Sequence, residues 1–241
     1  MNITISILCL DPQMKDYIHS GGNLRVIVAS DNQEDVNAIK EAFHSIFGLA
    51  TVYGIPTPPN KNVAVQPVGF AAAKSSANEK LDSIRDTHPE AKEDGTILTG
   101  KIVFQMHSIP FPIFLPNLNI LATILAIETF LLEVGDEDWI EQTCLVLDDK
   151  SKKYWQYTQP LPLPFSVIQK IQDSTSDSYP LSWSGYSQPI GPFMSDHLNV
   201  VSSKWHEASN GISRETLLQN AAKSLVYAYK SALKLAKVDQ V

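Results

Sequence analysis

Cysteine is scarce in this sequence. Cys9 and Cys144 are the only two cysteines among 241 residues, and they are far apart and without CxxC spacing. A disulfide framework and a cysteine zinc site are therefore excluded. A chain without disulfides is typical of a reducing compartment, so we expect the protein on the cytosolic side.

The sequence also lacks the short motifs of common enzyme classes. It contains no P-loop lysine signature, no GxGxxG, no GxSxG and no HExxH. Of its six histidines only His197 and His206 lie fairly close, and their nine-residue separation fits no standard metal spacing. No metal site is predicted from histidine.

Positive charge is in the minority. The chain has 19 basic and 26 acidic side chains, for a formal net charge of −7, and it has no long basic tract. Affinity for a phosphate backbone depends on clustered cations, so we expect no nucleic-acid partner. Residues 128–149 hold eight acidic side chains and no Lys or Arg.

Long apolar runs are also few. The stretch Ile102–Ile127 has no charged residue, but Pro110, Pro112 and Pro116 each remove a backbone donor that a bilayer cannot replace. We therefore expect no membrane span. The apolar start of the chain lacks a positively charged leader, and no signal peptide is expected.

What is present is an alternation of strand-like and helix-like segments, which predicts an α/β domain. Helices are expected from about Asp31 to Gly48, in the ranges 69–85 and 166–172, and from an N-cap at Ser213 onward. Short apolar runs predict strands at 24–29, 50–53, 121–128, 143–149 and 153–159.

Three positions stand out chemically. Glu128 follows an apolar run, and the carboxyl end of a strand in an α/β sheet usually faces the ligand crevice; the alternative is a residue that caps a strand at the surface. Arg214 lies in the first turn of the last helix, where a cation opposes the helix dipole, so it either pairs with a carboxylate or meets an anionic ligand. Asp148-Asp149 predicts a turn, or alternatively a cation site.

The segment 24–48, LRVIVASDNQEDVNAIKEAFHSIFG, resembles the opening strand and helix of the purine nucleoside triphosphatases that act on inosine and xanthosine triphosphates. The resemblance implies an inosine-triphosphatase/Maf-like mixed sheet, flanked by helices and with a central cleft. It also implies a set of nucleotide- or anion-binding candidates and one catalytic or magnesium-binding carboxylate. These residues are Ser30, Asn32, Ser213 and Arg214 for the anion, and Glu128 for the carboxylate.

The same comparison shows two departures. Asp35 stands where the family has a lysine, and a carboxylate repels a triphosphate. Alanines follow Gln66-Pro67-Val68-Gly69-Phe70 where the family places magnesium ligands. We therefore expect a degenerate, non-catalytic site without a cofactor. The alternative is a magnesium-dependent inosine or xanthosine triphosphatase that relies on Glu128.

A closer resemblance is to the C-terminal domain of the proline-rich and coiled-coil-containing protein 1 family. It implies a homodimer, binding to the regulatory subunit of cyclic-AMP-dependent protein kinase, and a place at Golgi and early secretory membranes on the cytosolic side. The blocks that carry it are QPVGFAA from Gln66, LDSIR from Leu81, CLVLDD from Cys144, LSWSG from Leu181, Leu198-Asn199-Val200, Trp205-His206 and GISR from Gly211.

These comparisons also set the expected boundaries. Residues 1–23 are expected to be a poorly ordered extension, and residues 24–237 a single domain with an insertion at about 100–123, for which a translated intron is one hypothesis. Two contact surfaces are predicted. One is the acidic stretch Glu133–Glu141 around Trp139; the other is a basic face of the last helix, formed by Arg214, Lys223, Lys230, Lys234 and Lys237.

Overall fold

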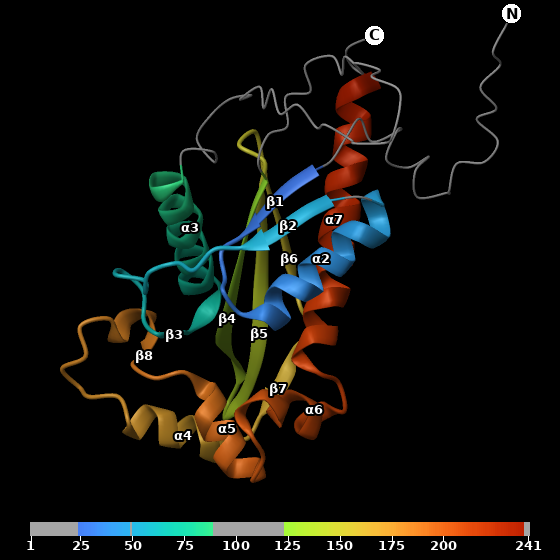
Figure 1. Cartoon of the computed structure of the whole chain (residues 1–241). Coiled ribbons are helices and arrows are strands. Elements are labelled where there is room, and N and C mark those ends of the chain that lie inside the picture. The colour runs from blue at the N-terminus through green and yellow to red at the C-terminus, as the bar shows by residue number, and fades with distance from the viewer. Residues whose placement is uncertain (1–23, 49, 89–122, 239–241) are drawn as a thin grey trace, which may run out of the picture.

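The structure, a computed structural model, describes residues 24–48, 50–88 and 123–238, with side chains described up to residue 233. The expectations for residues 1–23 and for most of the 100–123 insertion lie outside the described residues. Within these ranges the chain forms a mixed sheet with helices on both faces, as Figure 1 shows. The mixed α/β class expected from the sequence is confirmed.

The main sheet has six strands in the order β2-β1-β4-β5-β6, with β7 paired to β5. β1 is parallel to both β2 and β4, whereas β4, β5 and β6 are joined by antiparallel pairing. The strands are β1 (Leu24–Val28), β2 (Ala50–Gly54), β4 (Thr123–Gly135), β5 (Asp138–Asp148), β6 (Lys153–Tyr157) and β7 (Leu161–Leu163). A separate pair consists of β3 (Gln66–Pro67) and β8 (Gly185–Tyr186).

Helices α2 and α7 cover one face of the sheet and α3 covers the other (Figure 1). The shorter helices α4, α5 and α6 surround the far half of the long β4–β5 hairpin. The helices are α2 (Gln33–Phe47), α3 (Gly69–Thr87), α4 (Phe165–Asp173), α5 (Ile190–Leu198), α6 (Trp205–Asn210) and α7 (Arg214–Val238).

Local signals explain where α2 and α7 begin. The α2 N-cap is Asn32 rather than the predicted Asp31, because the Asn32 side chain accepts a hydrogen bond from the Glu34 amide at 2.8 Å. Gly48 ends α2 with φ of 79°, as predicted. The predicted N-cap of α7 is also confirmed, since the Ser213 hydroxyl accepts from the Thr216 amide at 3.2 Å.

Three buried apolar clusters form the core, and the β4–β5 hairpin contributes to all of them. The first lies between the sheet and α2/α7, and the second lies between the sheet and α3. The third holds the far half of the hairpin against β7 and the short helices α4 and α5. Alternate residues of β4 face opposite clusters, as the two-residue period of a strand requires: Leu125 belongs to the first cluster and Ala126 to the second.

The acidic stretch predicted as a connector and contact surface is instead part of this hairpin. β4 and β5 continue through it to a tight turn at Asp136-Glu137. Trp139 is only 6% exposed and packs in the third cluster, and Glu141 is buried as well. The prediction is therefore wrong for Trp139, which is a core residue. The tip of the hairpin does present an acidic surface, formed by the exposed side chains of Glu133, Asp136, Glu137 and Asp138.

Of the five side chains predicted to form a basic face of α7, two are engaged within the protein. Arg214 forms an ion pair with Asp35, and the Lys230 Nζ donates a hydrogen bond to the carbonyl of Ile46 and lies 5.3 Å from the centre of the Phe47 ring. These cations hold α7 against α2 instead of facing a partner. Lys223 is exposed, and the side chains of residues 234 and 237 lie outside the described part.

In the described ranges, no helix combines the length and apolar composition needed to cross a bilayer. Of the charge-free segment 102–127, the structure describes only residues 123–127, which begin the buried strand β4.

Candidate functional site

The end of β1 and the start of α2 place three polar side chains together. Ser30 lies two residues after the end of β1 and donates a hydrogen bond from its hydroxyl to Asp35 Oδ2 at 2.9 Å. The Ser30 hydroxyl also accepts from the Asn32 amide at 3.1 Å. Asp35 is 6% exposed, so its carboxylate depends on protein donors for its hydrogen bonds.

The cation for this carboxylate comes from the far end of the sequence. Arg214, at the first turn of α7, donates from its guanidinium to Asp35 Oδ1. Of the two possibilities left open for Arg214, the structure therefore shows the carboxylate partner. Asp35 occupies the position where an anionic ligand would meet both Arg214 and Ser30, and it satisfies them internally.

Ser213 and Asn32 are similarly engaged. The Ser213 hydroxyl lies 2.9 Å from the Thr216 hydroxyl and caps α7, while the Asn32 side chain caps α2. Space is also limited here. A side chain at Gly54, the last residue of β2, would collide with the Ser30 carbonyl and with Val36.

Glu128 does not end a strand, which corrects the prediction from the sequence. β4 continues for seven further residues to Gly135, so Glu128 lies in mid-strand and is 8% exposed. Its Oε2 accepts a hydrogen bond from the Ser76 hydroxyl at 2.5 Å and pairs with Lys80 Nζ at 2.8 Å. The two partners project from successive turns of α3.

The structure does not bring the predicted catalytic carboxylate to the predicted anion-binding residues. Glu128 points to the face of the sheet covered by α3, where it meets Ser76 and Lys80. Asp35 and Arg214 join α2 to α7 on the opposite face. A phosphate chain that is bound by Arg214 and attacked by a water molecule on Glu128 would have to reach around the end of the sheet and contact both of its faces.

The donor set around Glu128 does not fit a magnesium ion. Mg²⁺ prefers several oxygen ligands, including carboxylates, whereas Glu128 already has the Lys80 ammonium against its Oε2. In the described ranges, no group of three or more His, Cys, Asp or Glu side chains is arranged to hold a metal.

The second carboxylate pair noted in the sequence, Asp148-Asp149, forms the predicted turn. Asp149 Oδ1 accepts hydrogen bonds from the amides of Ser151 and Lys152 at 3.0 and 2.8 Å, and from the Ser151 hydroxyl at 2.8 Å. Asp148 Oδ1 accepts from the Lys150 amide at 2.8 Å. Both carboxylates are buried, and they organise the β5–β6 connection.

A buried contact between a histidine and a glutamate beside the third cluster was not predicted from the sequence. His206 Nε2 lies 3.2 Å from Glu141, and both residues are about 95% buried. The Trp205 ring lies 3.7 Å from the His206 ring, measured between centres. Only the dipeptide Trp205-His206 was noticeable in the sequence, because its partner Glu141 stood among acidic residues assigned to the surface.

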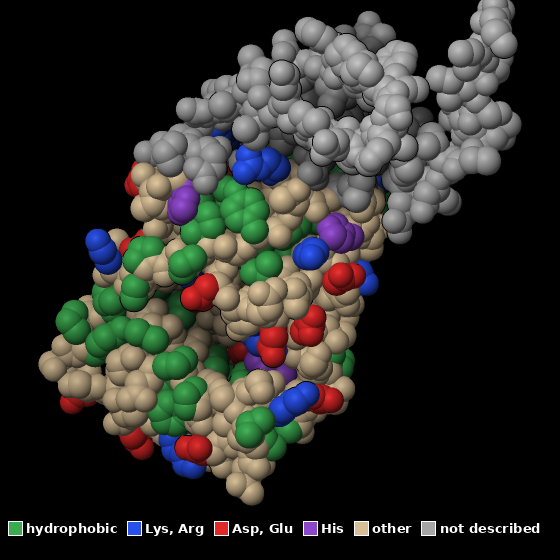
Figure 2. Space-filling view, in the orientation of Figure 1, with side chains coloured by type: hydrophobic (Ala, Val, Ile, Leu, Met, Phe, Trp, Pro, Cys, Tyr) green, Lys and Arg blue, Asp and Glu red, His purple; other side chains and the backbone are tan. Residues whose placement is uncertain are grey.

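A hollow is visible at the middle of one face of the molecule. Figure 2 shows it between α2 and α3 above and the helices α4 and α5 below.

No model of a known protein family matches the chain. Among solved structures, protein VC0702 from Vibrio cholerae is similar, with a TM-score of 0.57 and 15% sequence identity. The alignment covers 88% of this chain and 98% of that protein. At this identity the similarity establishes a shared α/β fold and nothing about the chemistry.

Proposed function

We propose that this protein is a non-catalytic binding module built on a nucleotide-hydrolase fold of the inosine-triphosphatase type. The observation that supports this proposal is that the buried carboxylates near the carboxyl ends of the parallel strands pair with cations of the protein itself. Arg214 is paired with Asp35, and Glu128 is paired with Lys80. A ligand phosphate would have to displace one protein carboxylate, and a metal would have to displace one ammonium.

Displacing these partners is costly for a physical reason. Asp35 and Glu128 are both more than 90% buried, so separating either from its cation leaves a charge with little access to water. Hydrolysis between phosphates needs a metal to neutralise charge and a base to orient water. The buried pairs favour a structural use of residues that an enzyme would keep available.

The partner we propose is the regulatory subunit of cyclic-AMP-dependent protein kinase, at Golgi and early secretory membranes on the cytosolic side. The support is the resemblance to the proline-rich and coiled-coil-containing protein 1 family, with its blocks in order along the chain. The same resemblance supports a homodimer. Light scattering should then give twice the chain mass of 26.7 kDa.

The catalytic question is tested by incubating purified protein with inosine or xanthosine triphosphate and magnesium. We expect no turnover above the protein-free rate. Turnover that disappears in Glu128→Gln but persists in Glu133→Gln, an exposed glutamate of the same strand, would establish the enzyme alternative instead. Glu133→Gln changes the same strand at its exposed end, so this control distinguishes general damage to β4 from the loss of a catalytic base.

The binding question is tested with purified kinase regulatory subunit and the full chain in calorimetry. A saturable complex is expected. Absence of a complex, both in calorimetry and in size-exclusion chromatography of the mixture, would remove this partner but leave the non-catalytic assignment in place. A second probe is Asp35→Lys. This substitution should raise nucleotide affinity if the nucleotide pocket of the triphosphatase family persists; unchanged affinity means that the pocket is closed.

A further inference from the structure

β6 lies at the edge of the main sheet, and one of its two sides is unpaired. In the described ranges β6 pairs with β5 and with no strand on its other side. The Thr158 amide donates to the Thr143 carbonyl at 2.9 Å, and the register then directs the main-chain groups of every second residue to β5. The residues between them direct their N–H and C=O groups outward. These residues are Lys153, Trp155 and Tyr157.

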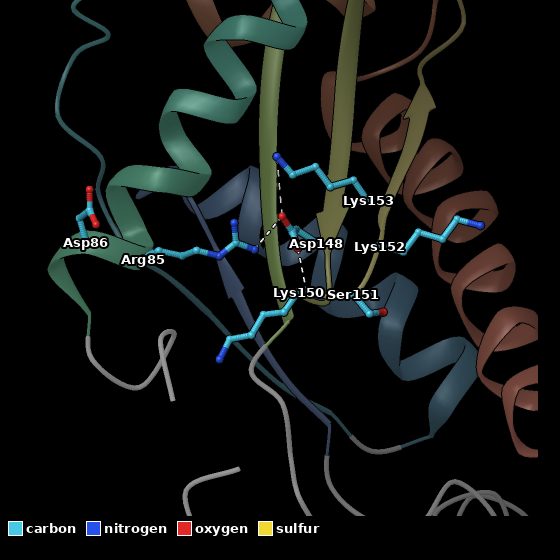
Figure 3. Close-up of a pocket in the computed structure, with 7 residues that line it drawn as sticks. All are labelled: Arg85, Asp86, Asp148, Lys150, Ser151, Lys152 and Lys153. Atoms are coloured by element: carbon cyan, nitrogen blue, oxygen red, sulfur yellow. Dashed lines mark hydrogen bonds and ion pairs between the residues drawn. The ribbon is translucent and has the colours of Figure 1, made fainter. Parts of the chain in front are cut away.

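The composition of β6 leaves this edge suited to pairing. Exposed edges are usually protected by charges, proline or a bulge, because unpaired main-chain groups attract another strand. β6 has the sequence KYWQY, without proline, and its register with β5 is regular. Its single charge is used within the chain, since Lys153 lies 3.8 Å from the buried Asp148 and donates to the Asn78 side chain at 2.5 Å. Figure 3 shows Lys153 directed toward Asp148.

A stripe of uncharged, exposed side chains lies along α7 beside this edge. α7 packs next to β6, where the rings of Tyr154 and Tyr229 lie 5.4 Å apart between centres. A groove of about 190 Å³ lies between the end of β6 and the first half of α7. The stripe begins at this groove and follows the helical repeat, and its largest member is 68% exposed. Its members are Asn220, Ser224, Tyr227, Ala228 and Ser231.

A second copy of the chain matches the edge and the stripe together. Antiparallel pairing of β6 with itself about a two-fold axis at Trp155 places Lys153 of one copy opposite Tyr157 of the other, so no like charges meet. Because α7 lies beside β6 on one face of the sheet, the same axis brings the two stripes next to each other. An extended peptide of another protein would pair with β6 but would leave the stripe uncovered.

The opposite face of β6 carries aromatic side chains that the same pairing would cover. Trp155 and Tyr157 pack at the border of the second cluster. Lys74 Nζ lies 5.5 Å from the centre of the Trp155 ring. Phe70 is 42% exposed, and its ring centre lies 5.3 Å from that of Tyr157. Pairing at the edge continues this aromatic group across the two-fold axis and removes apolar surface from water.

We propose that β6 and the stripe of α7 form the interface of the homodimer, with the two sheets joined edge to edge. The inference rests on the homodimer proposed above and names its surface. Main-chain hydrogen bonds between the two copies of β6 fix the register, and contacts between the stripes select a second copy over other strands. The nearest charges, Lys153 and Lys74, keep their partners within one chain.

The first test is light scattering on the full chain and on an edge variant. The wild-type chain is expected at twice 26.7 kDa when measured up to about 100 μM, which detects micromolar association. Trp155→Glu should reduce the mass to 26.7 kDa, because two carboxylates then meet across the axis. Within one chain the new carboxylate lies beside Lys74, which favours folding of the variant. Circular dichroism checks the fold.

A second variant changes only the surface of α7. Ser224→Arg places a long charged side chain in the groove beside β6 and should also give the single-chain mass. Ser45→Arg, on α2, is the matched control and should remain a dimer. Both serines are exposed, and their hydroxyls donate to a carbonyl of the same helix, Ser224 to Asn220 at 3.4 Å and Ser45 to Ala42 at 2.9 Å.

Amide hydrogen exchange places the contact at the edge itself. The outward amides of residues 153, 155 and 157 should exchange more slowly in the wild-type dimer than in Ser224→Arg, because they are bonded only in the dimer. A wild-type chain that is monomeric overturns the homodimer and this interface together. A dimer that persists in either interface variant, or that is lost equally in Ser45→Arg, overturns the interface and leaves the homodimer in place.

Discussion

The two edges of the sheet hold the same kinds of charged side chain, but they use them differently. At the carboxyl edge each buried carboxylate has one dedicated cation, as in Asp35–Arg214 and Glu128–Lys80. At the amino edge, where the parallel strands begin, one buried carboxylate, Asp148, is shared by Arg85 and Lys153. The difference teaches that a buried carboxylate can be compensated either by one cation or by several cations that share it.

The largest effect is expected from breaking the Asp35–Arg214 pair. Arg214→Met should lower the free energy of unfolding by about 2–4 kcal/mol, because Asp35 then remains buried with the Ser30 hydroxyl as its described side-chain donor. Urea denaturation measures it. Glu215→Gln, an exposed change in the same helical turn, is the control. A loss no larger than that of the control would mean that Arg214 is not committed to Asp35.

The second pair should show a smaller loss. Lys80→Met leaves Glu128 with the Ser76 hydroxyl, and we expect about 1–3 kcal/mol of destabilisation for a buried charged acceptor that loses a partner. Lys74→Met, at an exposed position of the same helix, is the matched control. If Lys80→Met is neutral, the carboxyl edge is not held by charge compensation, and the comparison between the edges fails.

At the amino edge, the β5–β6 turn contributes to the stability of the fold. Asp149→Ala removes the acceptor for two amides and a hydroxyl and should cost about 1–2 kcal/mol by urea denaturation. Asp149→Asn keeps an oxygen at the same position and should cost less. A ranking in which Asn and Ala are equally damaging would show that the charge, and not the hydrogen bonds, organises this turn.

The last prediction concerns β5, the strand that joins the two edges, and its effect is visible only in alkaline solution. Burial raises the pKa of the Cys144 thiol from 9.0 to about 12, so the folded protein keeps this proton where the unfolded chain loses it. Stability should therefore fall as pH rises from about 9 to 12. In Cys144→Ala this part of the fall should disappear, as followed by urea denaturation across that range. An unchanged pH slope would contradict the raised pKa.

Much of the fold could be predicted from local patterns. The run LRVIV in β1 is buried by helices on both faces of the sheet, and α2 follows it with apolar residues at helical spacing. The far half of the β4–β5 hairpin could not be predicted, because its acidic residues suggested a surface connector. There Trp139 is buried by residues of β7, α4 and α5 in the third cluster. This burial is a tertiary effect that the local sequence pattern does not contain.

The site was predictable only in part. In the sequence, Arg214 was noticeable as a cation in the first turn of a helix, where it opposes the helix dipole. Asp35 was noticeable as a carboxylate where the enzyme family has a lysine. The two residues are 179 positions apart, so no local signal showed that each explains the other. For the same reason the ion pairs of Asp148 were not predicted: Arg85 lies at the end of a helix and Lys153 begins β6, and only the fold brings them to Asp148.

The long hairpin has a consequence for how the molecule comes apart. Because β4 and β5 cross all three apolar clusters, neither half of the protein has a core of its own that excludes these two strands. Heat should therefore melt both halves together in one cooperative transition. Tryptophan fluorescence reports on Trp139 and Trp205 in the third cluster and on Trp155 beside the second cluster. Circular dichroism reports on all helices, and the two measurements should give the same midpoint temperature.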